Sequence, residues 1–84
     1  MLSSRLIEIF KAVVEEFIAT AEPVGSKTLV EKYNLPYSTA TIRNEMMELE
    51  NLGLIEKTHT SSGRVPSSEG YRFYVENLMN SHID

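Results

Sequence analysis

The sequence predicts a mainly α-helical fold with one small β-hairpin. Up to residue 53, apolar residues recur at steps of three and four in three separate stretches, which is the period of an amphipathic helix. Residues 54–66 instead show two short extended patterns around a loop that contains glycine, and a fourth helical pattern follows. Because 84 residues suffice for one compact domain with a single core, we expect residues 1–84 to form one domain.

The first helix is expected over residues 6–18, with its end near Thr20. Charged residues mostly separate its apolar positions, which are Leu6, Ile9, Phe10, Val13 and Phe17. Ser3 or Ser4 can cap its start, because a serine oxygen accepts a hydrogen bond from an unpaired first-turn amide. Residues 22–25 contain a proline and break the helical pattern, so we expect only a short extended piece there.

A second, short helix is expected to begin at Ser26 and to stop at Asn34, since asparagine tolerates the left-handed backbone conformation. Its apolar side consists of Leu29, Val30 and Tyr33. After a turn, Ser38 is predicted to cap a third helix that runs to about Leu52 and is closed by Gly53. The line of this third helix that faces the core is predicted to be Ile42, Met46 and Leu49. The residues expected to point outward are Ala40, Arg43, Asn44, Met47 and Asn51.

The hairpin is expected to have residues 54–59 and 64–66 as its two arms. Pro66 cannot donate a ladder hydrogen bond, which suits the end or edge of a strand. Ser67 or Ser68 then opens a fourth helix, whose apolar stripe is predicted to be Tyr71, Tyr74, Val75 and Leu78. The order helix, short strand, helix, turn, helix, hairpin, helix is that of the winged helix-turn-helix fold. In that fold the hairpin is the wing, and the helix before it enters the major groove of DNA.

Composition narrows the possible classes of protein. The chain has no cysteine, which excludes disulfides, thiolate nucleophiles and most zinc sites. Its start lacks the zones of a signal peptide, and no apolar run approaches the ~20 residues of a membrane span. We therefore expect a cytoplasmic protein with no membrane partner.

The net charge of −4 argues at first sight against DNA, because lysine and arginine supply most non-specific affinity for phosphates. The distribution of charge matters more than this total. One acidic block consists of Glu45, Glu48, Glu50 and Glu56. Locally positive segments carry Lys27, Lys32 and Arg43, and later Lys57, Arg64 and Arg72. A small basic face on an acidic body is compatible with DNA binding.

The main candidates for DNA contact lie on the third helix. Ser38, Thr39 and Thr41 cluster at its start, where unpaired amides and the positive end of the helix dipole favour a phosphate oxygen. Arg43 has no acidic neighbour three or four residues away, and its guanidinium can pair with guanine O6 and N7 or hold a phosphate. Asn44 can bond adenine N6 and N7. The alternatives are that Ser38 only caps the helix and that Arg43 and Asn44 are solvated.

Further candidates lie in the hairpin and on the second helix. Gly63 allows a tight turn, and Arg64 at the edge of the loop can reach a narrow minor groove or the DNA backbone. The small donors suited to phosphates are Thr60, Ser61 and Ser62. A solvated hairpin tip is the alternative. Lys27 is the last candidate, although Glu31 four residues later also allows a helix ion pair. Arg72 has the same explanation, with Glu69 and Glu76 as its partners.

The sequence shows no constellation for catalysis, for a metal or for a cofactor. The only histidines are His59 and His82, the chain has no cysteine, and its one aspartate is at the terminus. There is no Ser-His-Asp set with a visible orienting acid and no glycine-rich phosphate loop. We expect a protein that is not an enzyme and has no cofactor. The alternative function is a winged-helix module that binds another protein instead of DNA, which the acidic total favours.

Several blocks of this sequence resemble the HrcA family of heat-inducible repressors. They are residues 22–29, 40–46, 49–50, 53–54, 59–66 and 70–72, in the order of that family. The resemblance runs from about Ser3 to Met79, and one departure is Thr58, where the family usually has proline.

This resemblance implies a homodimeric repressor that binds an inverted-repeat operator of chaperone operons and releases it on heat stress. It also implies a dimerisation and regulatory region outside these 84 residues and a chaperonin as modulator.

Overall fold

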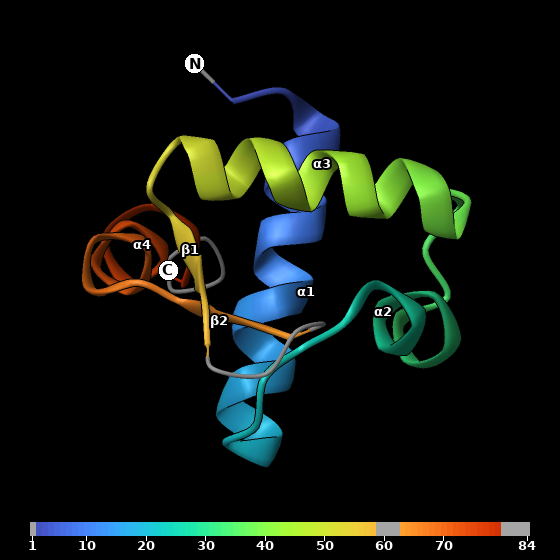
Figure 1. Ribbon diagram of the computed structural model, residues 1–84. Helices are drawn as coiled ribbons and strands as arrows, with labels where there is room; N and C mark the ends of the chain where they lie inside the picture. Colours follow the sequence, from blue (N-terminus) through green and yellow to red (C-terminus); the bar gives the residue numbers. More distant parts are fainter. Residues whose placement is uncertain (1, 59–62, 80–84) are drawn as a thin grey trace.

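The computed structural model describes residues 2–58 and 63–79 and has the predicted order of elements, with a π-helix continuing the last α-helix (Figure 1). The elements are α1 (Ser4–Thr20), α2 (Ser26–Tyr33), α3 (Thr39–Asn51), β1 (Ile55–Lys57), β2 (Arg64–Pro66), α4 (Ser68–Phe73) and the π-helix η1 (Tyr74–Leu78). In Figure 1, α3 crosses α1, α2 lies beside the start of α3, and the hairpin begins at the other end of α3. Over the described residues, the predicted mainly α-helical fold with a small hairpin is confirmed.

The helices begin at capping side chains and end at left-handed residues largely as predicted. Ser3 caps α1 and Ser67 caps α4, each accepting a hydrogen bond from the backbone N–H three residues later. Asn34 ends α2 with a φ of 52°, and Gly53 follows α3 with a φ of 82°. α1 ends at Thr20 as predicted, and Ala21 after it adopts the left-handed conformation with a φ of 59°. Alanine carries no sequence signal for this conformation, which usually belongs to glycine or asparagine.

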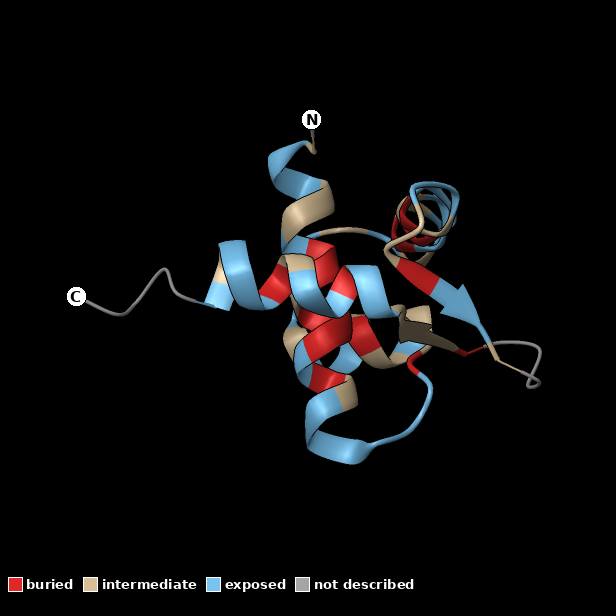
Figure 2. Ribbon diagram, turned by 90° about the vertical axis from the view of Figure 1, so that its left-hand side faces the viewer, coloured by how far each residue is buried: buried red, intermediate tan, exposed pale blue. Residues whose placement is uncertain are grey.

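The core is built around α1. Figure 2 shows the buried residues where the helices meet, while the outer sides of the helices are exposed. Phe10 is fully buried in the middle of α1, and its ring lies 6.0 Å from that of Phe73 at an angle of 51°. The three predicted core residues of α3 are all buried: Ile42, Met46 and Leu49. Removing these apolar surfaces from water is the main source of stability in a domain of this kind.

The hairpin is joined by a third extended segment. β1 pairs antiparallel with β2, and Ile55 lies opposite Pro66, which confirms the end position expected for this proline. Val24 forms an isolated antiparallel bridge with Arg64, so the short extended piece predicted at residues 22–25 runs along β2. The segment that leads into α2 is therefore fixed against the loop end of β2.

The predicted apolar stripe of the fourth helix is partly wrong. Tyr74 is buried, as expected, but Tyr71 is 46% exposed and Val75 is 37% exposed. The buried side of α4 includes Gly70, where an added Cβ would lie 1.9 Å from the carbonyl oxygen of Leu54. Because glycine has no side chain, an apolar pattern does not mark Gly70 as buried, and the pattern assigns Tyr71 and Val75 to the buried side instead. The change to a π-helix after α4 also breaks the 3.6-residue period.

Candidate nucleic-acid interface

The third helix has one buried side and one free side. The five residues predicted to point outward are all exposed: Ala40, Arg43, Asn44, Met47 and Asn51. Within the described part of the chain, Arg43 and Asn44 make no ion pair and no side-chain hydrogen bond. A guanidinium and a carboxamide are therefore presented side by side to solvent from a helix whose other side is fixed in the core.

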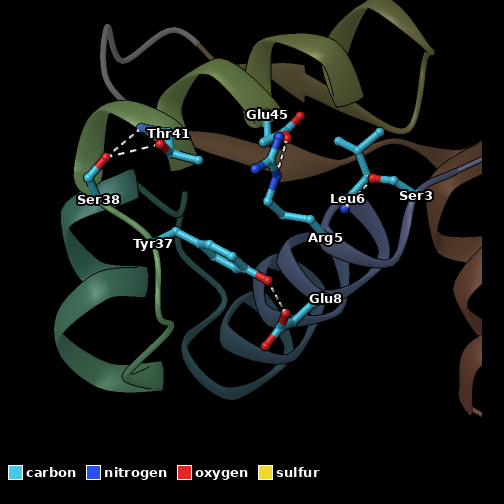
Figure 3. Close-up of polar contacts among 8 residues, drawn as sticks. All are labelled: Ser3, Arg5, Leu6, Glu8, Tyr37, Ser38, Thr41 and Glu45. Carbon is cyan, nitrogen blue, oxygen red and sulfur yellow. Dashed lines mark hydrogen bonds and ion pairs between the residues drawn. The ribbon is translucent and has the colours of Figure 1, made fainter.

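The start of α3 is held by a local network. Ser38 caps the helix as predicted: its Oγ accepts a hydrogen bond from the Thr41 N–H at 3.1 Å and donates one to Thr41 Oγ1 at 3.0 Å (Figure 3). Thr39 and Thr41 are both half-buried, and Ser38 is exposed. The hydroxyl of Thr41 is thus oriented by Ser38 at the end of the helix that favours anions.

A second network fixes this half of α3 to α1. Arg5 pairs with Glu45, and its guanidinium lies over the ring of Tyr37 at 5.9 Å from the centroid. The hydroxyl of Tyr37 donates a hydrogen bond to Glu8 Oε1 at 2.7 Å (Figure 3). This hydrogen bond to a carboxylate raises the pKa of Tyr37 above its usual value, since deprotonation would place two negative charges together.

A groove lies between the start of α2, the exposed side of α3 and the loop end of β2. It is lined by Pro23, Gly25, Ser26, Lys27, Thr28, Arg43, Met46, Met47, Gly63 and Arg64. Three cations predicted to contact DNA, from three separate parts of the sequence, therefore line one groove: Lys27, Arg43 and Arg64.

The helix ion pairs that spacing allows for Lys27 and Arg72 are not formed among the described residues. Among residues 2–58 and 63–79, the ion pairs join different elements instead: Arg5 with Glu45, Lys32 with Glu16, and Arg64 with Glu50. Lys27 is exposed and does not pair with Glu31. Spacing along one helix allows a contact at its surface, but long solvated side chains gain little by forming it.

Arg64 occupies a different environment from Lys27 and Arg43. Its side chain is only 16% exposed, and its Nε donates a hydrogen bond to Glu50 Oε1 at 2.9 Å. Its Nη1 donates to the carbonyl oxygen of Gly63 at 3.2 Å. Glu50 is a partner of Arg64 that the sequence does not reveal, because the two residues lie on different elements and no local spacing signals such a contact.

Three hairpin residues predicted to contact phosphates, Thr60, Ser61 and Ser62, lie outside the described residues, as does His59. Among the residues that are described, no group of three histidine, cysteine or acidic side chains could hold a metal ion. No described helix combines the length and apolar character that crossing a membrane requires.

Comparison with known proteins agrees with this geometry. The domain family described as the DeoR-like helix-turn-helix domain matches residues 14–67. The heat-inducible transcription repressor HrcA of Oceanobacillus iheyensis is 55% identical over 85 residues, which cover 98% of this chain and 25% of the relative. HrcA of Clostridium perfringens is 52% identical over 79 residues, covering 94% of this chain and 23% of the relative.

A solved structure has the same fold. A crystal structure of a hypothetical protein at 2.2 Å resolution superposes with a TM-score of 0.85 at 44% sequence identity, covering 89% of this chain and 24% of the other. The resemblance to HrcA repressors is thereby confirmed, and this chain spans about a quarter of the length of those relatives. With the family match extending from within α1 to the end of the hairpin, the chain belongs to the DeoR-like helix-turn-helix domain family.

Proposed function

We propose that this chain is the sequence-specific DNA-binding part of a transcriptional repressor. The observation that carries the proposal is the free outward side of α3, where Arg43 and Asn44 are exposed beside a groove that Lys27 also lines. In a helix-turn-helix protein, the second helix of the motif enters the major groove, and its outward side chains contact the base edges. Here that helix is α3.

Each candidate residue has a role that its chemistry supports. Arg43 pairs with guanine O6 and N7, and Asn44 with adenine N6 and N7. The hydroxyls of Ser38, Thr39 and Thr41 lie at the start of α3 and contact a phosphate there. Lys27 contacts the DNA backbone from the start of α2 on the other side of the groove. In the hairpin, Thr60, Ser61 and Ser62 are proposed to contact phosphates as the wing approaches the DNA.

The net negative charge of the chain is compatible with DNA binding. Glu45 and Glu50, both on α3, are engaged by Arg5 and Arg64, which offsets part of the negative charge on the helix. Glu48 is exposed toward the end of α3, away from the cluster at its start. Arg43 and Lys27 line the groove beside the first two turns of α3, where their charges add to the positive end of the helix dipole.

For the whole protein, we propose a homodimeric repressor of heat-shock operons, because the relatives are named heat-inducible transcription repressors. Residues 1–84 would form one domain of that cytoplasmic, nucleoid-associated protein. Its operator would be an inverted repeat, its dimer contacts would lie outside this chain, and a chaperonin would modulate it. The chain alone should bind DNA weakly, since a dimer gains by engaging two half-sites at fixed spacing. We also propose that the chain is not an enzyme.

The test is a fluorescence anisotropy titration at several salt concentrations. The duplexes are first selected from a random pool by the full-length protein. A recovered inverted repeat would identify both the DNA partner and the two-fold symmetry of binding. We expect affinity to fall steeply with salt, because each phosphate contact releases counterions. A preference for the selected duplex over a scrambled one is also expected. Affinity that does not depend on salt or on sequence would favour the alternative, a winged-helix module that binds another protein.

A further inference from the structure

Arg64 is held by three parts of the chain at once. Its backbone exchanges two hydrogen bonds with Val24, one from the Val24 N–H at 2.8 Å and one to the Val24 carbonyl at 2.9 Å. Its side chain donates to Glu50 in the last turn of α3 at 2.9 Å. Its place in β2, opposite Lys57, makes it part of the hairpin itself. The hydrogen bond to Glu50 thus directs the Arg64 guanidinium toward α3.

The residue before Arg64 adds a steric constraint. An added Cβ at Gly63 would lie 2.3 Å from the Cβ of Pro23, so the hairpin packs directly on the segment before α2. Gly63 is buried. The loop end of β2 is thus joined to the segment leading into α2 by backbone hydrogen bonds and packing, and Arg64 joins it to α3 through the ion pair with Glu50.

We infer that Arg64 and Glu50 are positioning residues, which set the orientation of the hairpin relative to α3. The inference rests on the proposed DNA-binding function and deepens it. It gives Arg64 a role different from the direct DNA contact that its sequence position suggested, because its Nε is directed to Glu50 and its side chain is mostly buried. Lys27 and Arg43 are then the groove cations available to DNA, because neither makes an ion pair among the described residues.

Glu50 could act on DNA binding through its charge alone or through its hold on Arg64, and these two roles predict opposite effects when Glu50 is changed. Replacing a carboxylate near a DNA-binding groove with an amide removes a negative charge, so electrostatics alone predicts tighter binding. If Glu50 instead orients the hairpin through Arg64, Glu50→Gln weakens the charge-assisted hydrogen bond and DNA binding becomes weaker. The loss of one such hydrogen bond corresponds to roughly a tenfold fall in affinity.

The experiment compares the wild-type protein with three variants. The first is Glu50→Gln. The second is Glu48→Gln, a matched control two residues away on α3 whose carboxylate is exposed and makes no ion pair with a described residue. The third is the exchange Glu50→Arg with Arg64→Glu, which keeps the net charge and can restore the pair. Each is titrated with the selected duplex, and its folding is checked by circular dichroism.

We expect Glu50→Gln to bind roughly tenfold more weakly, Glu48→Gln to bind as tightly as wild type or more tightly, and the exchange to recover most of the loss. The recovery separates the two roles, because a glutamate at position 64 cannot replace an arginine that contacts a phosphate. Binding by Glu50→Gln that equals or exceeds that of Glu48→Gln would overturn the inference, as would an exchange that recovers nothing.

A measurement without DNA keeps the inference distinct from the proposed function. In the NMR spectrum of Glu50→Gln, the amides of Val24 and Arg64 should shift, whereas Glu48→Gln should leave both in place. Unshifted amides in the Glu50 variant would refute a positioning role whatever the DNA result. If the wild-type protein shows no salt-dependent DNA binding while these amides do shift, the proposed function fails and the link between Glu50 and the hairpin stands.

Discussion

Lys32 Nζ donates a hydrogen bond to Glu16 Oε2 at 2.9 Å, which joins α2 to α1. Glu16 is only 5% exposed and is the one buried charged residue in the described part of the chain, whereas Lys32 is largely exposed. The carboxylate of Glu16 also contributes, after burial, to raising the pKa of Tyr33. This ion pair, with one buried member, adds to the apolar packing of Leu29 in holding α2, which forms one side of the groove.

Replacing Lys32 should destabilise the protein more than removing an equivalent exposed charge. Lys32→Gln leaves the carboxylate of Glu16 buried without its cation, which should lower the free energy of unfolding by about 1–3 kcal/mol. Lys57→Gln is the control, because Lys57 is an exposed lysine of β1 with no ion pair among the described residues. Urea denaturation of both variants measures the difference, and equal midpoints would contradict the prediction.

The cap of α3 can be tested by changing one side chain. Ser38→Ala removes the oxygen that accepts from the Thr41 N–H, so the free energy of unfolding should fall by about 1 kcal/mol. Ser38→Asp retains an oxygen at the same position and should stay near wild type. Thermal denaturation distinguishes the two, and a loss of the same size in both would mean that capping is not the role of Ser38.

Arg43 is predicted to contribute to DNA binding and not to stability. Arg43→Ala should weaken binding to the selected duplex by about 1–3 kcal/mol if the guanidinium pairs with a base, and its preference over a scrambled duplex should fall. Arg72→Ala is the matched control, since it removes one exposed cation from α4. Anisotropy titrations measure both variants, and affinities equal to wild type on both duplexes would exclude base contact by Arg43.

The raised pKa values of three tyrosines lead us to expect a loss of stability in alkaline solution. Burial raises the pKa of Tyr33 and of Tyr74, and the hydrogen bond to Glu8 raises that of Tyr37, all from the usual value of 10.0. The folded state therefore holds these protons more tightly than the unfolded state. Their contribution is fully present below pH 10.0 and is lost as the pH rises through the folded pKa values.

Denaturation measured at a series of alkaline pH values tests this dependence. The free energy of unfolding should decrease as the pH rises above 10.0, and Tyr37→Phe should show a shallower decrease because it lacks one of the three phenols. A free energy of unfolding that stays constant or increases over that range would contradict the assignment.

Features set by neighbouring residues could be predicted from the sequence. The caps Ser3 and Ser38 and the left-handed Asn34 act on backbone groups within a few residues, so local spacing suffices to identify them. The buried line of α3 follows from its helical period in the same way. For the candidate interface, this local pattern was enough to place Arg43 and Asn44 on the outward side.

The remaining features depend on contacts between distant elements. Arg64 was predicted at the edge of the loop, but its partner Glu50 becomes a neighbour only after α3 and the hairpin have packed together. Lys32 likewise lies near Glu16 only because α2 packs on α1. The burial of Gly70 could not be predicted for a different reason: glycine has no apolar side chain, so it does not contribute to an apolar pattern.

The paired hydrogen bonds between Val24 and Arg64 enclose all of α2, α3 and β1 within one loop of chain. Each of the two amides donates to the other residue's carbonyl, so both are protected from hydrogen exchange only while the two segments lie together. The two amides should therefore open to exchange in a single cooperative step. A peptide that ends before β2 leaves the Val24 N–H without its partner, so the helix-turn-helix cannot be shortened to its helices alone without losing this closure.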